Sequence, residues 1–175
     1  MRVLLADDHQ LLRQAIRRAL EDAGMAVVAE AGDGGEAVRL VGELQPDVVV
    51  MDMSMPVLVV DDYNTMIRII RNLLKQIGFQ DIDDAADGSA ALARMREKRY
   101  GLVISDWNME PMTGYDLLRE VRADTNLAMT PFIMITAESK TENVIAAKKA
   151  GVDNYIVKPF NAQTLRSKIE TVFAG

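Results

Sequence analysis

Residues 48–63, VVVMDMSMPVLVVDDY, contain two apolar runs of the kind that form buried strands, and each run ends in aspartate. The first ends at Asp52, and only the four residues Met53 to Pro56 separate it from the second, which begins at Val57. Neighbouring parallel strands need a crossover of about a dozen residues or more. The two runs therefore cannot be adjacent parallel strands of one sheet. They form either an antiparallel hairpin or parts of separate layers.

On both sides of this joint, short strand-like runs alternate with longer segments of helical periodicity. Strands are predicted at residues 2–8, 25–31, 47–52, 57–62, within 81–87, and at 101–106, 131–136 and 154–158. Helices are predicted at residues 9–24, 33–45, 64–78, 88–99, 114–124, 140–151 and 161–173. Strands that alternate with helices form right-handed βαβ units, so we expect an α/β fold with a mostly parallel sheet covered on both faces.

Two of the predicted helices show a clear apolar stripe. The stripe of 9–24 consists of Leu12, Ile16, Ala19 and Leu20, and the stripe of 161–173 consists of Leu165, Ile169, Val172 and Phe173. This spacing places the apolar residues of each helix on one face.

The segment before residue 57 and the segment after it repeat one pattern. VLLADD resembles VLVVDD, AEAGDGGEAV resembles DDAADGSAAL, and DVVVMDMSMP resembles GLVISDWNMEP. The first copy contains two and a half strand–helix repeats, whereas the second contains five. The chain therefore carries a partial internal duplication.

Composition narrows the class of protein. The length of 175 residues suits one domain, or one domain with an additional fragment. A net charge of −6 gives no basic footprint for nucleic acid. No cysteine is present, the apolar runs are too short to cross a bilayer, and the start MRVLLADDH is unlike a signal peptide. We expect a cytoplasmic protein that binds neither nucleic acid nor membrane.

Polar residues stand at the predicted carboxyl ends of the strands after residue 57. They are Asp61, Asp62, Asp106, Thr136 and Lys158. Ligands of open parallel sheets bind at this edge, and carboxylates held close together repel each other unless a cation joins them. Oxygen ligands suit Mg²⁺, and a lysine and a threonine can bind phosphoryl oxygens. The pattern predicts a site that holds a phosphoryl group on a carboxylate.

Residues 57–174 resemble the receiver domains of response regulators, specifically the chemotaxis CheY family. The stretches VLVVDDYNTMIRIIRNLL, GLVISDWNMEPMTGYDLL, MITAES and NYIVKPF carry the resemblance in that order and spacing. It implies a flavodoxin-like, doubly wound parallel sheet. It also implies that a histidine kinase donates the phosphoryl group, that a flagellar switch protein is a partner, and that the protein is at most a slow self-phosphatase rather than a conventional enzyme.

The same resemblance assigns roles to individual residues. Asp106 would be the phosphoacceptor, and Thr136 and Lys158 would contact the phosphoryl oxygens. Tyr155 would be an aromatic switch that turns inward when Thr136 moves toward the phosphate. The Mg²⁺ ligands would be Asp61, Asp62, Asp106 and the backbone carbonyl of Asn108.

Residues 1–56 resemble the first half of a receiver domain of the NarL/FixJ transcriptional family, through LLADDHQLLRQAIRRAL and PDVVVMDMSMP. Asp7, Asp8 and Asp52 match the metal pair and the acceptor. We expect these three residues to be vestigial, because the half stops before a threonine or lysine partner. His9 is interpreted as a residue of the helix start. The two subfamilies differ, so we interpret the chain as an engineered chimera, with natural recombination as the alternative.

The arrangement of the two segments has three alternatives. Residues 57–175 form an intact receiver and residues 1–56 mediate association, such as a homodimer; or residues 1–56 replace 57–106 in a hybrid receiver; or both segments merge into one new fold. We favour the intact receiver. For function, a signalling module with an acceptor at Asp106 is the main hypothesis, and a fusion of receiver fragments without retained signalling is the alternative.

Overall fold

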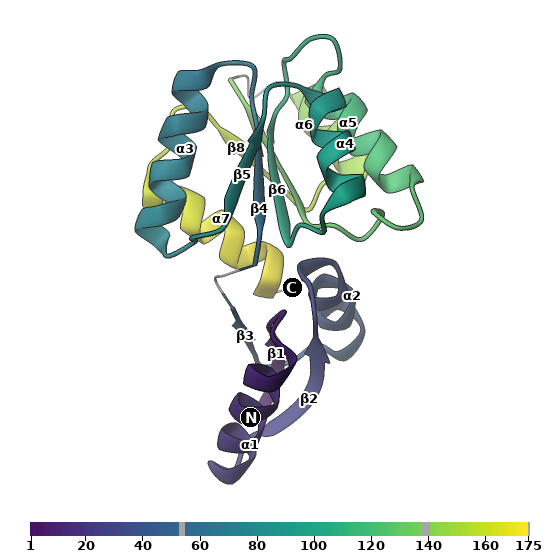
Figure 1. Cartoon of the computed structure of the whole chain (residues 1–175). Helices are drawn as coiled ribbons and strands as arrows, with labels where there is room; N and C mark the ends of the chain where they lie inside the picture. The colour runs from purple at the N-terminus through teal and green to yellow at the C-terminus, as the bar shows by residue number, and fades with distance from the viewer. Residues whose placement is uncertain (53–54, 138–140, 175) are drawn as a thin grey trace.

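The structure is a computed structural model that describes residues 1–52, 55–137 and 141–174 (Figure 1). The strands are β1 Arg2–Ala6, β2 Ala26–Ala31, β3 Val48–Met51, β4 Val57–Val60, β5 Ile82–Ala85, β6 Leu102–Asp106, β7 Phe132–Thr136 and β8 Asn154–Val157. The helices are α1 Gln10–Asp22, α2 Gly34–Leu44, α3 Asn64–Ile77, α4 Gly88–Glu97, α5 Gly114–Ala123, α6 Thr141–Lys149 and α7 Ala162–Ala174. Across the described residues, no helix has the length and apolar character needed to cross a membrane.

The strands form two parallel sheets. The first has the order β2-β1-β3, and the second has the order β5-β4-β6-β7-β8. The second order is that of the flavodoxin-like doubly wound fold, in which the first strand lies beside the second and third. This confirms the expected fold class.

The joint at residues 52–57 connects the two sheets rather than two strands of one sheet. β3 pairs with β1, and β4 pairs with β5 and β6. β3 and β4 therefore form no hairpin, and residues 1–56 neither enter the five-stranded sheet nor replace residues 57–106 in it. Figure 1 shows the two sheets stacked end to end, with the carboxyl edge of the first facing the amino edge of the second.

Close backbone packing holds the two segments together. A Cβ atom at Gly34 would lie 2.1 Å from the carbonyl oxygen of Gly101, and one at Gly35 would lie 2.8 Å from that of Met129. Such distances leave no room for a side chain, so helix α2 can start against the second segment only with glycine at these positions. Beside them, Arg99 Nη1 lies 3.2 Å from Asp33 Oδ2.

Helix α7 contributes to the core of both sheets. Its predicted stripe is buried, with Leu165 fully enclosed and Phe173 only 5% exposed. The helix packs against α3 and β8 of its own sheet, and also against α2 and β3 of the other. Leu4 and Ala6 of the first sheet belong to the same continuous apolar cluster. The two segments therefore share one core rather than meeting through a polar boundary.

Helix α1 differs from the helix that repeats it. Each residue of the first copy corresponds to the residue 54 positions later, so Ile16 and Leu20 match Ile70 and Leu74 of α3. Ile70 and Leu74 are fully buried, whereas α1 contains no buried residue and Leu12 is 50% exposed. The reason is that α3 packs against both its sheet and α7, whereas the main contacts of α1 are with β1 and β2 of its own sheet.

The duplication extends to the helix caps. Asp33 accepts a hydrogen bond from the Glu36 backbone N–H at 2.8 Å, and Asp87 accepts one from the Ala90 backbone N–H at 3.0 Å. Aspartate at this position satisfies a backbone donor that has no partner within the helix. The same local interaction therefore starts the equivalent helix in each copy.

Candidate functional site

The carboxyl edge of the five-stranded sheet brings four of the predicted residues together. Asp106 and Thr136 are the last residues of β6 and β7, and Asp61 and Lys158 directly follow β4 and β8. The Lys158 ammonium donates a hydrogen bond of 2.8 Å to Asp106 Oδ1 and lies 3.8 Å from Asp61 Oδ2. Because all these strands are parallel, residues far apart in the chain meet at one edge.

The two central carboxylates are buried. Asp61 is 1% exposed and Asp106 is 7% exposed, whereas Asp62 is exposed to solvent. Burial raises the pKa of the Asp61 carboxyl, and repulsion from Asp106 raises it further. The Tyr63 backbone N–H, which donates to Oδ1 at 2.8 Å, acts in the opposite direction and lowers this pKa. The environment therefore disfavours a charged Asp61 when no cation is bound.

The donor set fits a hard divalent cation. One carboxylate oxygen each from Asp61, Asp62 and Asp106 lies within 4.8 Å of the others. Asp61 Oδ2 is buried and has no hydrogen-bond partner among the described residues. A buried carboxylate oxygen without a hydrogen bond is costly, and coordination to a cation would satisfy it. Asn108, the fourth predicted ligand, lies exposed in the loop after β6.

The remaining predicted residues lie close to this edge. Thr136 is 4% exposed, and its carbonyl oxygen accepts a hydrogen bond of 2.8 Å from the Lys158 backbone N–H. Tyr155 is half-buried on β8, and the ammonium of Lys168 lies 5.1 Å from the centre of its ring. This backbone hydrogen bond holds Thr136 and Lys158 side by side at the carboxyl ends of β7 and β8.

Two contacts around Asp106 were not expected from the sequence. A Cβ atom at Gly114 would lie 2.0 Å from the carbonyl oxygen of Asp106, and the Ser105 hydroxyl donates to the same oxygen at 2.9 Å. Glycine at the start of α5 therefore lets this helix approach the acceptor residue. The glycine was visible in the sequence, but nothing there showed which atom it approaches.

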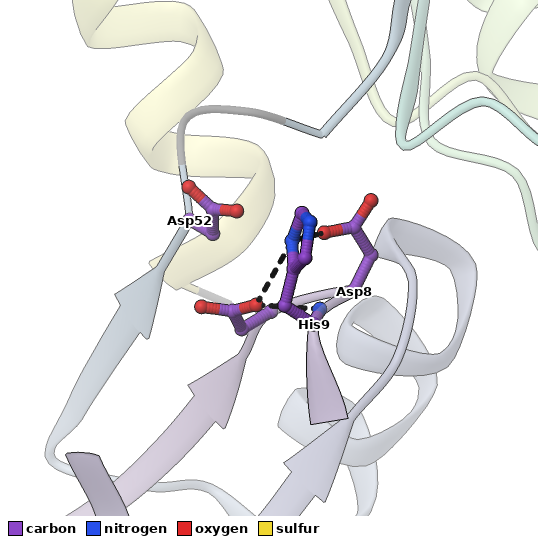
Figure 2. Close-up of side chains that lie close together, drawn as sticks. Asp8, His9 and Asp52 are labelled. Atoms are coloured by element: carbon purple, nitrogen blue, oxygen red, sulfur yellow. Dashed lines mark hydrogen bonds and ion pairs between the residues drawn. The ribbon is translucent and has the colours of Figure 1, made fainter. Parts of the chain in front are cut away.

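A second acidic cluster lies at the carboxyl edge of the first sheet (Figure 2). Asp7, Asp8, His9 and Asp52 each offer a ligand atom within 4.8 Å of the others. Asp7 is buried and accepts the His9 backbone N–H at 2.7 Å, and His9 Nδ1 lies 2.6 Å from Asp8 Oδ1. Residues 1–56 contain no threonine and no lysine, so this sheet has no counterpart of Thr136 or Lys158.

Two curated chemotaxis proteins are similar to about two thirds of the chain. The chain is 50% identical over 119 residues to the chemotaxis protein CheY of Pseudomonas aeruginosa, which covers 68% of this chain and 96% of the relative. It is 46% identical over 124 residues to the chemotaxis protein CheY-3 of Vibrio cholerae, which covers 71% of this chain and 95% of the relative.

Two solved structures are also similar to about two thirds of the chain. The chemotaxis response regulator CheY4 of Vibrio cholerae matches with a TM-score of 0.63 and 35% identity, over 67% of this chain and 98% of that one. The receiver domain of a sensor histidine kinase from Pseudomonas aeruginosa, described with a magnesium ion coordinated in its active site cleft, matches with a TM-score of 0.64 and 25% identity, over 70% and 99%.

A family model settles the classification. The model described as the response regulator receiver domain matches this chain twice, over residues 3–56 and over residues 57–170. The first match begins within β1 and the second begins at β4. These are the strands that come first along the chain in the two sheets. The chain therefore belongs to the response regulator receiver domain family of chemotaxis and two-component signalling.

Proposed function

We propose that residues 57–175 form a complete receiver domain that accepts a phosphoryl group on Asp106 from the phosphohistidine of a histidine kinase. The observation that carries this proposal is the buried Asp106 carboxylate, 2.8 Å from the Lys158 ammonium and beside Asp61 Oδ2, which has no hydrogen-bond partner among the described residues. A carboxylate oxygen of Asp106 forms a bond to phosphorus while the bond from phosphorus to the donor's imidazole nitrogen breaks.

The neighbouring residues have separate roles in this proposal. The carboxylates of Asp61, Asp62 and Asp106, with the carbonyl of Asn108, would hold Mg²⁺, which neutralises charge on the phosphoryl group when bound. The Lys158 ammonium binds one phosphoryl oxygen. The Thr136 hydroxyl donates to another, and this contact moves the end of β7 toward Asp106.

The output of the proposed switch lies on the surface of α6, β8 and α7. Tyr155 on β8 would turn inward as Thr136 moves, and this rearrangement changes the face that a partner binds. The relatives carry the name of chemotaxis proteins, which supports a flagellar switch protein as that partner. The same relatives support a cytoplasmic location.

Residues 1–56 form the second part of the proposal. We assign them to a half-receiver of NarL/FixJ type, joined to the complete receiver in a chimera. Asp7, Asp8 and Asp52 take no part in phosphoryl transfer, because no lysine or threonine stands beside them in this segment.

The single tryptophan provides a direct test. Trp107 follows the acceptor and stacks on Tyr115, with ring centroids 5.3 Å apart. Beryllofluoride, which mimics a phosphoryl group on aspartate, should change Trp107 fluorescence only when Mg²⁺ is present. The change should disappear in Asp106→Asn and persist in Asp52→Asn. An unresponsive parent protein would favour the alternative function, a fused scaffold without signalling.

A further inference from the structure

The edge of β3 is open where its counterpart is covered. β6 lies between β4 and β7, and its residues Leu102 and Ile104 are at most 1% exposed. β3 is the edge strand of its sheet and pairs with β1. Val48, the counterpart of Leu102, is 39% exposed. An apolar edge strand of this kind is a template for pairing with another chain.

The helix beside this edge is open in the same way. In the complete copy, Ile70 and Leu74 of α3 are fully buried because α7 packs beside α3. Their counterparts Ile16 and Leu20 remain half-exposed, and Leu12 is 50% exposed. Among the described residues, the first copy therefore has no strand like β7 beside β3 and no helix like α7 on the outer face of α1.

The edge of β3 is also accessible. A groove of about 390 Å³ runs beside it, lined by Val48, Val49 and Met51 on the strand and by Ile169 and Phe173 on α7. Its walls are mainly apolar, so the side chains of an added strand would enter an environment similar to a domain core.

From these observations we infer that the open surface of β3 and α1 binds the second half of a receiver domain supplied by another polypeptide. An apolar strand with the chemistry of β7 would pair in parallel with β3. An amphipathic helix with the chemistry of α7 would cover Leu12, Ile16 and Leu20. This inference goes beyond the function proposed above and does not depend on phosphorylation of Asp106.

The number of receiver halves in each chain excludes a second copy of this chain as the source of the missing half. Each chain contains two first halves and one second half, so exchange between copies leaves one first half open in every chain. The negative charge of residues 1–56 also disfavours direct pairing of this segment with the same segment of a second copy. Residues 1–56 contain five Arg and Lys and ten Asp and Glu, a net charge of −5, whereas residues 107–175 contain eight of each and are neutral. A second half therefore approaches residues 1–56 without the repulsion that a second copy of them would bring.

The test uses the full-length chain and a dye-labelled polypeptide of residues 107–175 as the probe. Sedimentation velocity and fluorescence anisotropy should show a complex of one chain with one probe. Val48→Lys, at a position already 39% exposed, should weaken binding at least tenfold. The matched control Ile69→Lys, at a 44% exposed position on α3, should leave binding unchanged. Both variants should keep the circular dichroism spectrum and the single urea-unfolding transition of the parent, which shows that both sheets fold.

Three results would overturn the inference. The first is absence of a complex. The second is binding that Val48→Lys does not weaken, because the probe would then have exchanged into the five-stranded sheet. The third is a homodimer that Val48→Lys abolishes and the probe fails to dissociate, because a second copy would then be the occupant. Failure of the phosphorylation proposal would appear separately, as loss of the beryllofluoride response in the parent chain.

Discussion

Replacing Asp61 by Asn should stabilise the protein in the absence of a divalent cation. Asp61 is 1% exposed, and its Oδ2 atom has no hydrogen-bond partner among the described residues. The asparagine Oδ1 can still accept the Tyr63 backbone N–H, so the hydrogen bond of 2.8 Å is retained. The substitution therefore removes a buried charge without removing its one backbone contact.

The size of the effect follows from the charges around Asp61. With an effective dielectric constant of about 20, repulsion from Asp106, whose carboxylate oxygen lies within 4.8 Å, costs at least about 3.5 kcal/mol, and attraction to Lys158 at 3.8 Å contributes about 4.4 kcal/mol. These terms nearly cancel, which leaves the desolvation of Asp61 uncompensated. We expect Asp61→Asn to raise the free energy of unfolding by about 1–2 kcal/mol, or the melting temperature by about 2–8 °C.

The pH dependence has a definite sign. Burial holds the pKa of Asp61 above its usual value in the folded state, so between the unfolded and folded pKa values the native protein binds more protons than the unfolded chain. The parent therefore becomes relatively more stable as pH falls through the folded pKa. The advantage of Asp61→Asn should be fully present above that pKa and should shrink below it.

Urea unfolding with EDTA at neutral pH measures the difference, and repetition with Mg²⁺ provides the control. Mg²⁺ at 100 times its dissociation constant should stabilise the parent by about 2.7 kcal/mol and should stabilise Asp61→Asn far less, so the order of stability reverses. A variant that is less stable than the parent in EDTA would refute the reasoning. It would mean that attraction to Lys158 exceeds the desolvation cost.

Three further substitutions test the packing. Gly34→Ala should cost about 1–3 kcal/mol in urea unfolding because its Cβ would lie 2.1 Å from a backbone oxygen, whereas Gly42→Ala in the same helix, with nothing within 4 Å, should gain about 0.5–1 kcal/mol; equal effects would contradict the close approach. Phe173→Ala should cost about 3–5 kcal/mol and shift one common transition, because Phe173 belongs to the core of both sheets; separate transitions for the two sheets would contradict a shared core. Arg122→Ala should lower the free energy of unfolding by about 2–4 kcal/mol in calorimetry, because it leaves the Asp153 carboxylate without its cation. The loss should be smaller than for a fully buried ion pair, because the Asp153 side chain is 24% exposed. A loss below about 0.5 kcal/mol would show that water replaces the ion pair.

The sequence was sufficient for the elements and for the composition of the acidic site. The spacing of apolar residues and the positions of turn residues located the strands and helices, because secondary structure is encoded in local sequence patterns. The meeting of Asp106 with Lys158, 52 positions apart, followed from parallel strands that end at one edge. The strand order of a doubly wound sheet determines which strand ends lie together, so the residues at those ends could be predicted to meet.

The relation between the two segments could not be obtained from the sequence. The apolar stripe of α1 looks like that of α7, yet α7 is buried and α1 stays exposed. A stripe shows that a helix can be covered but not whether any element is left to cover it. The contact of Gly34 with Gly101 is equally invisible, because no local pattern specifies which distant backbone approaches a glycine.

The central claim is that the complete receiver after residue 57 carries the working acceptor. Intact-mass analysis after treatment with acetyl phosphate and Mg²⁺, on the parent, Asp106→Asn and Asp52→Asn, tests it most directly. The account predicts one phosphoryl adduct on the parent and on Asp52→Asn, and none on Asp106→Asn. An adduct that is lost in Asp52→Asn and kept in Asp106→Asn would contradict the account, because the first segment would then have captured Thr136 and Lys158.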